Sequence, residues 1–265
     1  MSKAWESVSS LDLKNIKGVC LDIDDTLSSH GKLTAEAYAA LWRLKEKGFV
    51  VVPITGRPAG WCDQIIRFWP VDAVVGENGA FTFYMDKSSG RDVRKKFTTP
   101  GIDPEAQKKL ASLHKKILAH FPFAAVASDQ QYRECDLAID ICEDVAPWKD
   151  EDIKALLDLC HQEGAEAKLS SIHVNTWFGQ YDKKTGFKEW LKAGALGLSS
   201  SAPKHDDWIY IGDSPNDEPM FEYFTHSVGV ANLKRYMSSL KFPPAWITKK
   251  ESGGGFCEMV KTLTD

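Results

Sequence analysis

The sequence predicts an α/β fold in which a parallel sheet covered by helices is interrupted by an inserted second unit. Short, apolar, β-branched runs alternate with amphipathic helical patterns in the first part of the chain, the alternation is lost in the middle, and it returns after about residue 180. Such alternation is typical of a parallel sheet with helices on its faces. The chain has 265 residues, which is long enough for a core with an insertion.

The N-terminal part reads as a β-α-β-α-β unit. We expect a first strand over residues 18–23 and a helix over 35–47, with Thr34 at its N-cap and Gly48 as its stop. A second strand over 49–54, a helix over 60–69 and a third strand over 71–75 complete the unit.

The middle and C-terminal parts follow in the same way. Strands are expected over residues 81–85, 93–97, 137–141 and 172–178, and amphipathic helices over 104–120 and 150–163. The parallel pattern then returns with a helix over 187–195, a strand over 208–211, a helix over 218–224, a strand over 227–230 and a final helix after the glycines at 253–255. We therefore expect a core of residues 1–84 and 180–265 and an inserted α/β unit of residues 85–179.

Composition narrows the classes of function. The net charge is −4, so the basic footprint of a nucleic-acid-binding protein is missing and no nucleic-acid partner is expected. The six cysteines show neither a CxxC pair nor zinc-like spacing, which predicts reduced and mostly buried thiols. No apolar run approaches the length of a membrane span and the N-terminus lacks a signal-peptide pattern, so we expect a cytoplasmic protein without membrane contact. The sequence does not identify a protein partner.

Polar residues follow three of the predicted core strands. They are Asp22, Asp24 and Asp25 after the first, Thr55, Gly56 and Arg57 after the second, and Asp213 and Asp217 after the strand over 208–211. Ligands of open parallel sheets bind at the carboxyl ends of the strands, so we expect these side chains to converge. Carboxylates brought this close repel one another unless a cation lies among them, and Mg²⁺ suits a ligand set made only of oxygen atoms.

Spacing within these clusters predicts roles. Residues two apart in an extended segment point the same way, so Asp22 and Asp24 can face one substrate. Asp22 can attack phosphorus as a nucleophile, and Asp24 can protonate the leaving oxygen and later deprotonate water. Thr55 and the Gly56 amide can donate hydrogen bonds to the transferring group, and Lys183 is the best placed lysine to neutralise its charge. Arg57 either structures the loop or contacts phosphate.

The same residues resemble the motifs of the haloacid dehalogenase (HAD) superfamily. Asp22-Ile-Asp24-Asp-Thr26 resembles its DxDxT signature, Thr55-Gly56-Arg57 its second motif, Lys183 its third and Gly212-Asp213-Ser-Pro-Asn216-Asp217 its fourth, in the family's order and over essentially the whole chain. The insertion is similar to the C2B-type cap of the HAD-IIB (Cof-like) hydrolases. Relatives usually have Lys-Gly at the third motif, whereas Lys184 follows here and is the alternative to Lys183.

This resemblance implies a Rossmann-like core, an α/β cap and a Mg²⁺-dependent phosphatase that acts on a small-molecule phosphate ester. Asp22 would be the nucleophile and a magnesium ligand, and Asp24 the acid/base that also offers its main-chain carbonyl to the metal. Asp213 would be a further ligand, and Asp217 would bind directly or through water. The phosphoryl group would be held by Thr55, Lys183 and Asn216, and Asn78 in Gly76-Glu77-Asn78-Gly79-Ala80 resembles an Asn-Gly segment near the cap junction.

Selectivity is expected to lie in the cap, since a lid excludes water and contacts the leaving group. The candidate residues are Arg133, Glu134, His173, Asn175 and Trp177. The mixture of hydrogen-bonding and aromatic side chains over 172–178 favours a sugar phosphate or a similar polyol phosphate. A phosphomutase or phosphotransferase that uses the same aspartyl-phosphate is the alternative enzyme. A non-catalytic ligand-binding module is the third hypothesis, but its expected sign is the loss of a motif residue, and none is lost.

Overall fold

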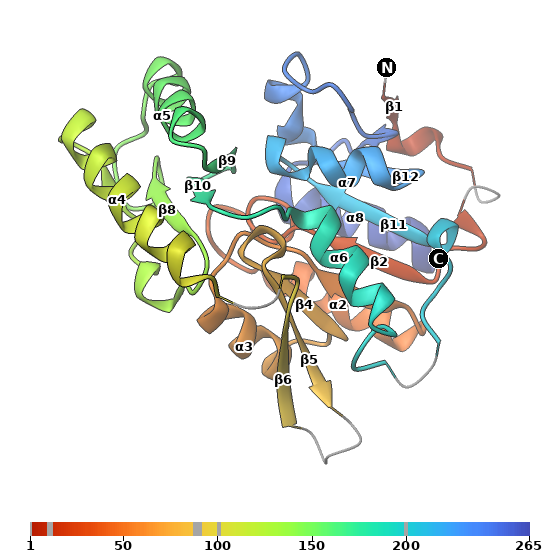
Figure 1. Cartoon of the computed structure of the whole chain (residues 1–265). Coiled ribbons are helices and arrows are strands. Elements are labelled where there is room, and N and C mark those ends of the chain that lie inside the picture. The colour runs from red at the N-terminus through yellow and green to blue at the C-terminus, as the bar shows by residue number, and fades with distance from the viewer. Residues whose placement is uncertain (1, 10–12, 87–91, 100–101, 199–200) are drawn as a thin grey trace.

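The structure is a computed structural model that describes residues 2–9, 13–86, 92–99, 102–198 and 201–265. A parallel sheet with helices on both sides forms one part of the molecule, and a second sheet with two helices of its own lies beside it (Figure 1). The chain leaves the first part after the strand that ends at Phe97 and returns through the helix that begins at Lys183. The predicted α/β class with a parallel sheet is confirmed.

Six parallel strands form the main sheet in the order β1-β13-β12-β11-β2-β3. Their bounds are β1 Lys3–Ala4, β2 Gly18–Leu21, β3 Val50–Pro53, β11 Trp208–Gly212, β12 His226–Gly229 and β13 Trp246–Ile247. Leu21 of β2 lies opposite Pro53 on one side and Ile211 on the other. The carboxyl ends of β2, β3 and β11 therefore share one edge of the sheet, where ligands of such folds bind.

Helices cover both faces of this sheet. The helices α2 (Ala35–Glu46) and α8 (Ser252–Thr264) pack on the face that carries Val19 and Leu21. On the opposite face, α6 (Lys183–Lys192) and α7 (Glu218–Tyr223) pack against Cys20 and its neighbours. Alternate side chains of a strand point to opposite faces, so a run of four apolar residues in β2 supplies both layers of the core.

A three-stranded antiparallel sheet extends the core. It consists of β4 (Ala73–Gly76), β5 (Phe81–Asp86) and β6 (Asp92–Phe97), with α3 (Ala59–Phe68) packed against it. A parallel bridge between Ile54 and Val75 links β4 to the main sheet. The boundary expected at residue 85 assigned β6 to the insertion, yet β6 pairs along its length with β5. We propose that the insertion begins near residue 98.

The insertion has a core of its own. Its antiparallel strands follow the order β7-β8-β10-β9, and α4 (Pro104–His120) and α5 (Asp150–Gln162) pack over apolar side chains of the sheet. The strands are β7 Ala125–Val126, β8 Leu137–Asp140, β9 Glu166–Leu169 and β10 His173–Trp177. In Figure 1 these elements form the lobe at the left of the main sheet. A separate apolar cluster supports the proposal that this lobe is a second folding unit.

Several local features differ from the expectation. α6 begins four residues before the predicted start because the Asp182 carboxylate accepts hydrogen bonds from the N–H and the hydroxyl of Thr185, both at 2.7 Å. The strands β1, β7, β9 and β13 have only two to four residues and were not predicted. Such short strands are stabilised by pairing within a sheet rather than by a local pattern.

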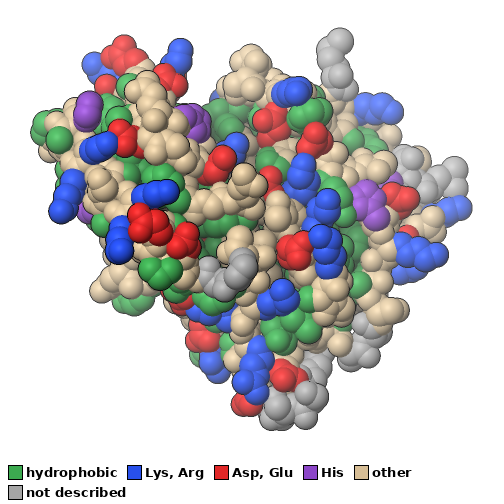
Figure 2. All heavy atoms as spheres, in the orientation of Figure 1, with side chains coloured by type: hydrophobic (Ala, Val, Ile, Leu, Met, Phe, Trp, Pro, Cys, Tyr) green, Lys and Arg blue, Asp and Glu red, His purple; other side chains and the backbone are tan. Residues whose placement is uncertain are grey.

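The surface gives two further findings. Charged side chains of both signs are interspersed on the face shown in Figure 2. Within the described part of the chain, no helix combines the length and the apolar character required to cross a bilayer.

Candidate active site

The predicted carboxylates converge at the shared edge of the main sheet. Asp22 follows β2 directly, and its N–H donates to the carbonyl of Ile211 in β11 at 2.9 Å. One oxygen atom each of Asp22, Asp213 and Asp217 lies within 4.8 Å of the others, and the three side chains are buried. Residues almost 200 positions apart in the sequence thus meet because parallel strands deliver their ends to one edge.

Lys183 lies inside this cluster. Its ammonium group donates to Asp22 Oδ1 and to Asp217 Oδ1, each at 2.6 Å, and to Asn216 Oδ1 at 3.3 Å. Burial by itself lowers the pKa of Lys183, but the charges of Asp217 and Asp22 outweigh it and raise the pKa. The side chain of Lys184 is 28% exposed and pairs with Glu222 at 2.7 Å. Of the two lysines in the sequence alternative, the structure brings Lys183 into the site.

Asp217 organises the loop after β11. Its Oδ2 accepts hydrogen bonds from the N–H groups of Asp213 and Ser214 at 2.9 and 3.1 Å. Its Oδ1 accepts from the hydroxyl of Tyr210 at 2.5 Å in addition to Lys183. Both oxygens are therefore occupied by donors, which leaves Asp213 and Asp22 better placed for direct contact with a metal. Tyr210 was not singled out from the sequence, although a tyrosine in an otherwise apolar buried strand is the signal that could have found it.

Two buried carboxylates of this cluster have raised pKa values, which favours the binding of a cation among the carboxylates. Burial, with the charges of Asp217 and Asp24, raises the pKa of Asp22 to about 8 although Lys183 opposes the shift. Burial and the charge of Asp22 likewise raise the pKa of Asp213 well above its usual range. Asp213 is held by Thr26 at 3.3 Å and by Asn232 at 3.3 Å, and neither contact adds a positive charge. A divalent ion bound by oxygen atoms fits this donor set, because it would favour the ionised carboxylates.

Polar groups surround the space in front of Asp22. The Asn78 amide nitrogen is buried without a hydrogen-bond partner among the described residues, while its oxygen accepts from Asn216 at 3.4 Å. A Cβ atom at Gly56 would lie 3.2 Å from that nitrogen, so a larger residue there would crowd it. Thr55 is fully buried, and its hydroxyl accepts from the N–H of Arg57 at 3.0 Å. These contacts place Asn78, Asn216, Gly56 and Thr55 next to one another, and their roles in binding a substrate remain predictions.

Asp24 turns its side chain toward Arg57. Nε of Arg57 lies 3.0 and 3.1 Å from the two Asp24 oxygens, and Nη2 lies 2.8 Å from Oδ1. The Asp24 carboxylate is 18% exposed and lies outside the cluster of three carboxylates. This position suits an acid/base better than a side-chain metal ligand, so the predicted metal contact of Asp24 rests on its carbonyl.

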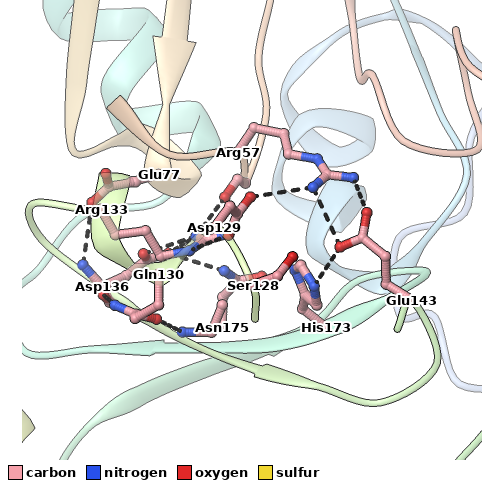
Figure 3. A network of polar contacts seen from close by, with 12 residues as sticks. Arg57, Glu77, Ser128, Asp129, Gln130, Arg133, Asp136, Glu143, His173 and Asn175 are labelled. Atoms are coloured by element: carbon pink, nitrogen blue, oxygen red, sulfur yellow. Dashed lines mark hydrogen bonds and ion pairs between the residues drawn. The ribbon is translucent and has the colours of Figure 1, made fainter. Parts of the chain in front are cut away.

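Three of the predicted insertion residues, Arg133, His173 and Asn175, have buried side chains at the junction with the core (Figure 3). Nη1 of Arg133 donates to the carbonyl of Gly56 at 2.9 Å and to Asp136 Oδ1 at 2.9 Å, and its side chain is 0% exposed. Asn175 donates to the other oxygen of Asp136 at 3.0 Å. The substrate contacts predicted for Arg133 and Asn175 remain predictions. In this arrangement Arg133 joins the insertion to the loop after β3, and Asn175 holds Asp136, the carboxylate that Arg133 also contacts.

Glu77 was not singled out from the sequence. Its carboxylate is fully buried and accepts hydrogen bonds from four backbone N–H groups, those of Ala59, Glu134, Cys135 and Asp136. Burial and Asp136 raise the pKa of Glu77 to about 8, whereas the N–H groups of Glu134 and Cys135 oppose the shift. This carboxylate ties the start of β8 in the insertion to the turn that carries Asn78. Only tertiary contacts distinguish it from an ordinary surface glutamate.

The fold and the site define an α/β protein with a carboxylate-rich centre at the ends of parallel strands. Residues 19–136 match the family model of the haloacid dehalogenase-like hydrolases. This match to the N-terminal part of the chain, together with the four ordered motifs and the parallel-sheet fold, agrees with the resemblance to the haloacid dehalogenase superfamily that the sequence motifs predicted. No curated protein matches the chain significantly in sequence.

Solved structures share the fold over nearly the full length. Thermoplasma acidophilum 0175 aligns with a TM-score of 0.70 at 18% identity, covering 94% of this chain and 98% of that one. The C-terminal domain of C. albicans trehalose-6-phosphate phosphatase aligns with a TM-score of 0.70 at 15% identity, covering 100% of this chain and 99% of that one. The HAD subclass IIB sugar phosphatase BT4131 aligns with a TM-score of 0.61 at 16% identity, covering 93% of this chain and 98% of that one. The insertion therefore has a counterpart within the aligned length of these structures.

Proposed function

We propose that the chain is a Mg²⁺-dependent phosphomonoester hydrolase that works through an aspartyl-phosphate on Asp22. The observation that carries this proposal is the buried cluster of Asp22, Asp213 and Asp217 with Lys183 at 2.6 Å from the proposed nucleophile. Phosphoryl transfer depends mainly on positioning and on neutralising the charge of the equatorial oxygens. A buried lysine and a metal-binding carboxylate pair beside one nucleophile supply both requirements.

The proposed metal ligands are the carboxylates of Asp22 and Asp213 and the carbonyl of Asp24, with Asp217 acting through water. When bound, Mg²⁺ would neutralise negative charge on the substrate and on the carboxylates. The donors proposed for the phosphoryl oxygens are Lys183, the Asn78 amide and the backbone around Thr55 and Gly56. Their burial supports strong interactions, because hydrogen bonds and charges act more strongly away from bulk water.

The reaction would proceed in two steps. In the first, an Asp22 oxygen forms a bond to phosphorus while the bond from phosphorus to the ester oxygen breaks, and Asp24 gives a proton to the departing alkoxide. In the second, Asp24 takes a proton from water as the water attacks the aspartyl-phosphate. Inorganic phosphate and the free carboxylate of Asp22 result.

The substrate proposed is a sugar phosphate or a similar polyol phosphate. Residues 170–173 of the insertion line a small space together with Asp22 and Asp24. A cleft of about 340 Å³ adjoins this space and has a mixed polar lining that includes Ser28, His30 and Arg235. Its size suits a small leaving group rather than a protein chain. Structures with the same fold include phosphatases named for trehalose 6-phosphate and for sucrose phosphate, which favours the same class.

A screen of a few dozen phosphate esters with Mg²⁺ tests the proposal, with release of inorganic phosphate as the readout. Asp22→Asn should reduce turnover at least about 10³-fold while the circular dichroism spectrum stays unchanged, because the nucleophile is lost and the shape is kept. Asp63→Asn, at an exposed ion pair with Arg67, is the matched control and should leave turnover unchanged. Turnover that persists in Asp22→Asn would remove Asp22 from this role. An isomerised sugar phosphate without phosphate release would favour the phosphomutase alternative.

A further inference from the structure

Three carboxylates meet one guanidinium group beside the proposed acid/base. Besides its paired contacts with Asp24, Arg57 donates through Nη2 to Glu143 Oε1 at 2.6 Å and through Nη1 to Asp129 Oδ2 at 3.2 Å. The Arg57 side chain is only 5% exposed. The Trp61 ring covers it, with the guanidinium carbon 4.4 Å from the ring centroid. All three guanidinium nitrogens therefore contact a carboxylate, as Figure 3 shows for Glu143 and Asp129.

The partners of Arg57 come from both parts of the molecule. Asp24 and Arg57 belong to the loops after β2 and β3, whereas Asp129 and Glu143 belong to the insertion. The N–H of Glu143 donates to Asp140 at the end of β8 at 2.7 Å, so its backbone is fixed to the insertion sheet. Arg57 thus connects the acid/base to the insertion.

Glu143 is itself held in place. His173 Nε2 of β10 lies 2.9 Å from Glu143 Oε2. Burial alone raises the pKa of Glu143, but the close contacts with His173 and Arg57 outweigh it and lower the pKa to about 2. Glu143 therefore presents a fixed negative charge to Arg57 near neutral pH. Paired, charge-assisted hydrogen bonds between a guanidinium group and a carboxylate fix the orientation of both groups as well as attracting them.

We propose that Glu143 is a positioning residue that acts through Arg57 to orient the carboxylate of Asp24 when the insertion lies against the core. Asp129 supports Arg57 from the same side. This inference rests on the proposed phosphatase function. If the insertion moved away, Arg57 would lose two of its three carboxylate partners and Asp24 would lose the fixed partner that directs it. The movement that brings the insertion against the core would then also orient the Asp24 carboxylate for proton transfer.

Two aryl phosphates of nearly equal shape test this role. Phenyl phosphate needs a proton on its leaving oxygen, whereas p-nitrophenyl phosphate releases a stable anion without one. The quantity to measure is kcat/KM, which reports formation of the aspartyl-phosphate. The loss of kcat/KM caused by Glu143→Gln should be about 10-fold larger for phenyl phosphate than for p-nitrophenyl phosphate. Acid catalysis contributes about 10²- to 10⁴-fold, so a partial loss of it is measurable on this scale. Glu143→Asp keeps the charge and should recover part of the loss. Asp129→Asn should act in the same direction with a smaller effect.

Glu151→Gln provides the matched control, because it makes the same change of charge on a side chain of α5 that is 76% exposed. Its ratio of the two substrates should equal that of the unmodified protein. An unchanged ratio in Glu143→Gln, or an equal loss for both substrates, would overturn the positioning role and leave the phosphatase proposal standing. If the unmodified protein hydrolyses neither ester nor any other phosphate ester in the presence of Mg²⁺, the proposed function itself fails, and the role of Glu143 with it.

Discussion

Replacing Gly79 by alanine should disable the site without touching a motif carboxylate. Gly79 follows Asn78 and has a φ of +106°, a conformation that residues with a Cβ atom rarely adopt. A Cβ atom at this position would lie 2.0 Å from the carbonyl oxygen of Asp182 and 3.1 Å from the nitrogen of Lys183. Because these are backbone atoms, no change of rotamer relieves the contact.

The size of the effect follows from these distances. Real Cβ contacts essentially never fall below 3.0 Å, so the start of α6 must move by about 1 Å, the difference between 3.0 and 2.0 Å. Lys183 begins α6 and lies 2.6 Å from Asp22, so its ammonium group would move with it. A misplacement of about 1 Å can cost about 10²-fold in rate. Overpacking adds a loss of about 1–3 kcal/mol in the free energy of unfolding.

Gly164→Ala separates the clash from the cost of the backbone conformation. Gly164 has a φ of +78° and no atom within 4 Å of a Cβ built on it. Both variants carry the conformational cost of about 1–2 kcal/mol, but only Gly79→Ala should lower kcat/KM. Hydrolysis of p-nitrophenyl phosphate and urea unfolding measure the two quantities. Equal activity in the two variants would refute the claim that the contact of Gly79 with Asp182 positions Lys183.

Two further predictions concern the charges of the site. Lys183→Met should lower kcat/KM about 10²- to 10³-fold, the usual cost of losing a donor to the transition state. Lys184→Met should stay within a few-fold, because the ammonium group of Lys184 pairs with Glu222 rather than with Asp22. Equal losses would show that both lysines serve the site. In metal-free protein, the ionised form of Asp22 is disfavoured because folding raises its pKa from 3.8 to about 8. The folded state therefore holds this proton more tightly, and the contribution of Asp22 to stability falls as pH rises through that window. Asp22→Asn should accordingly gain stability relative to the unmodified protein between pH 5 and 8, by about 1 kcal/mol or more, and Mg²⁺ should raise the Tm of the unmodified protein more at pH 8 than at pH 5. Thermal unfolding with EDTA or Mg²⁺ measures both effects, and a stability difference that does not change with pH would contradict them.

The chemistry at the strand ends was accessible from the sequence because it depends on local patterns. The change from apolar residues to Asp22 and Asp24 marks the end of a buried strand in the sequence. The strands before Thr55 and Asp213 end in the same recognisable way. Parallel strands place such ends at one edge, so the convergence follows from the fold class. The start of α6 was misjudged because its cap, Asp182, lies before an apolar pattern that becomes evident only further along the helix.

The choice between neighbouring residues was not accessible in the same way. Consecutive residues of a helix point about 100° apart, so one of Lys183 and Lys184 faces the core and the other faces solvent. The sequence does not fix the rotation of the helix against the sheet, and packing of Phe187 and Trp190 against Trp208 sets it. Arg57 posed a similar problem, because the two acidic partners that distinguish it lie 72 and 86 positions away.

By itself, the sequence determined the alternation of strands and helices, the places where strands end and the residue types at those ends. Tertiary structure decided which lysine reaches Asp22, that Asp217 and Glu77 organise backbone loops, and that the insertion contacts the acid/base through Arg57. The physical reason is range. Periodicity and capping act over a few residues, whereas a buried charge takes whichever partners the packed chain brings within hydrogen-bonding distance.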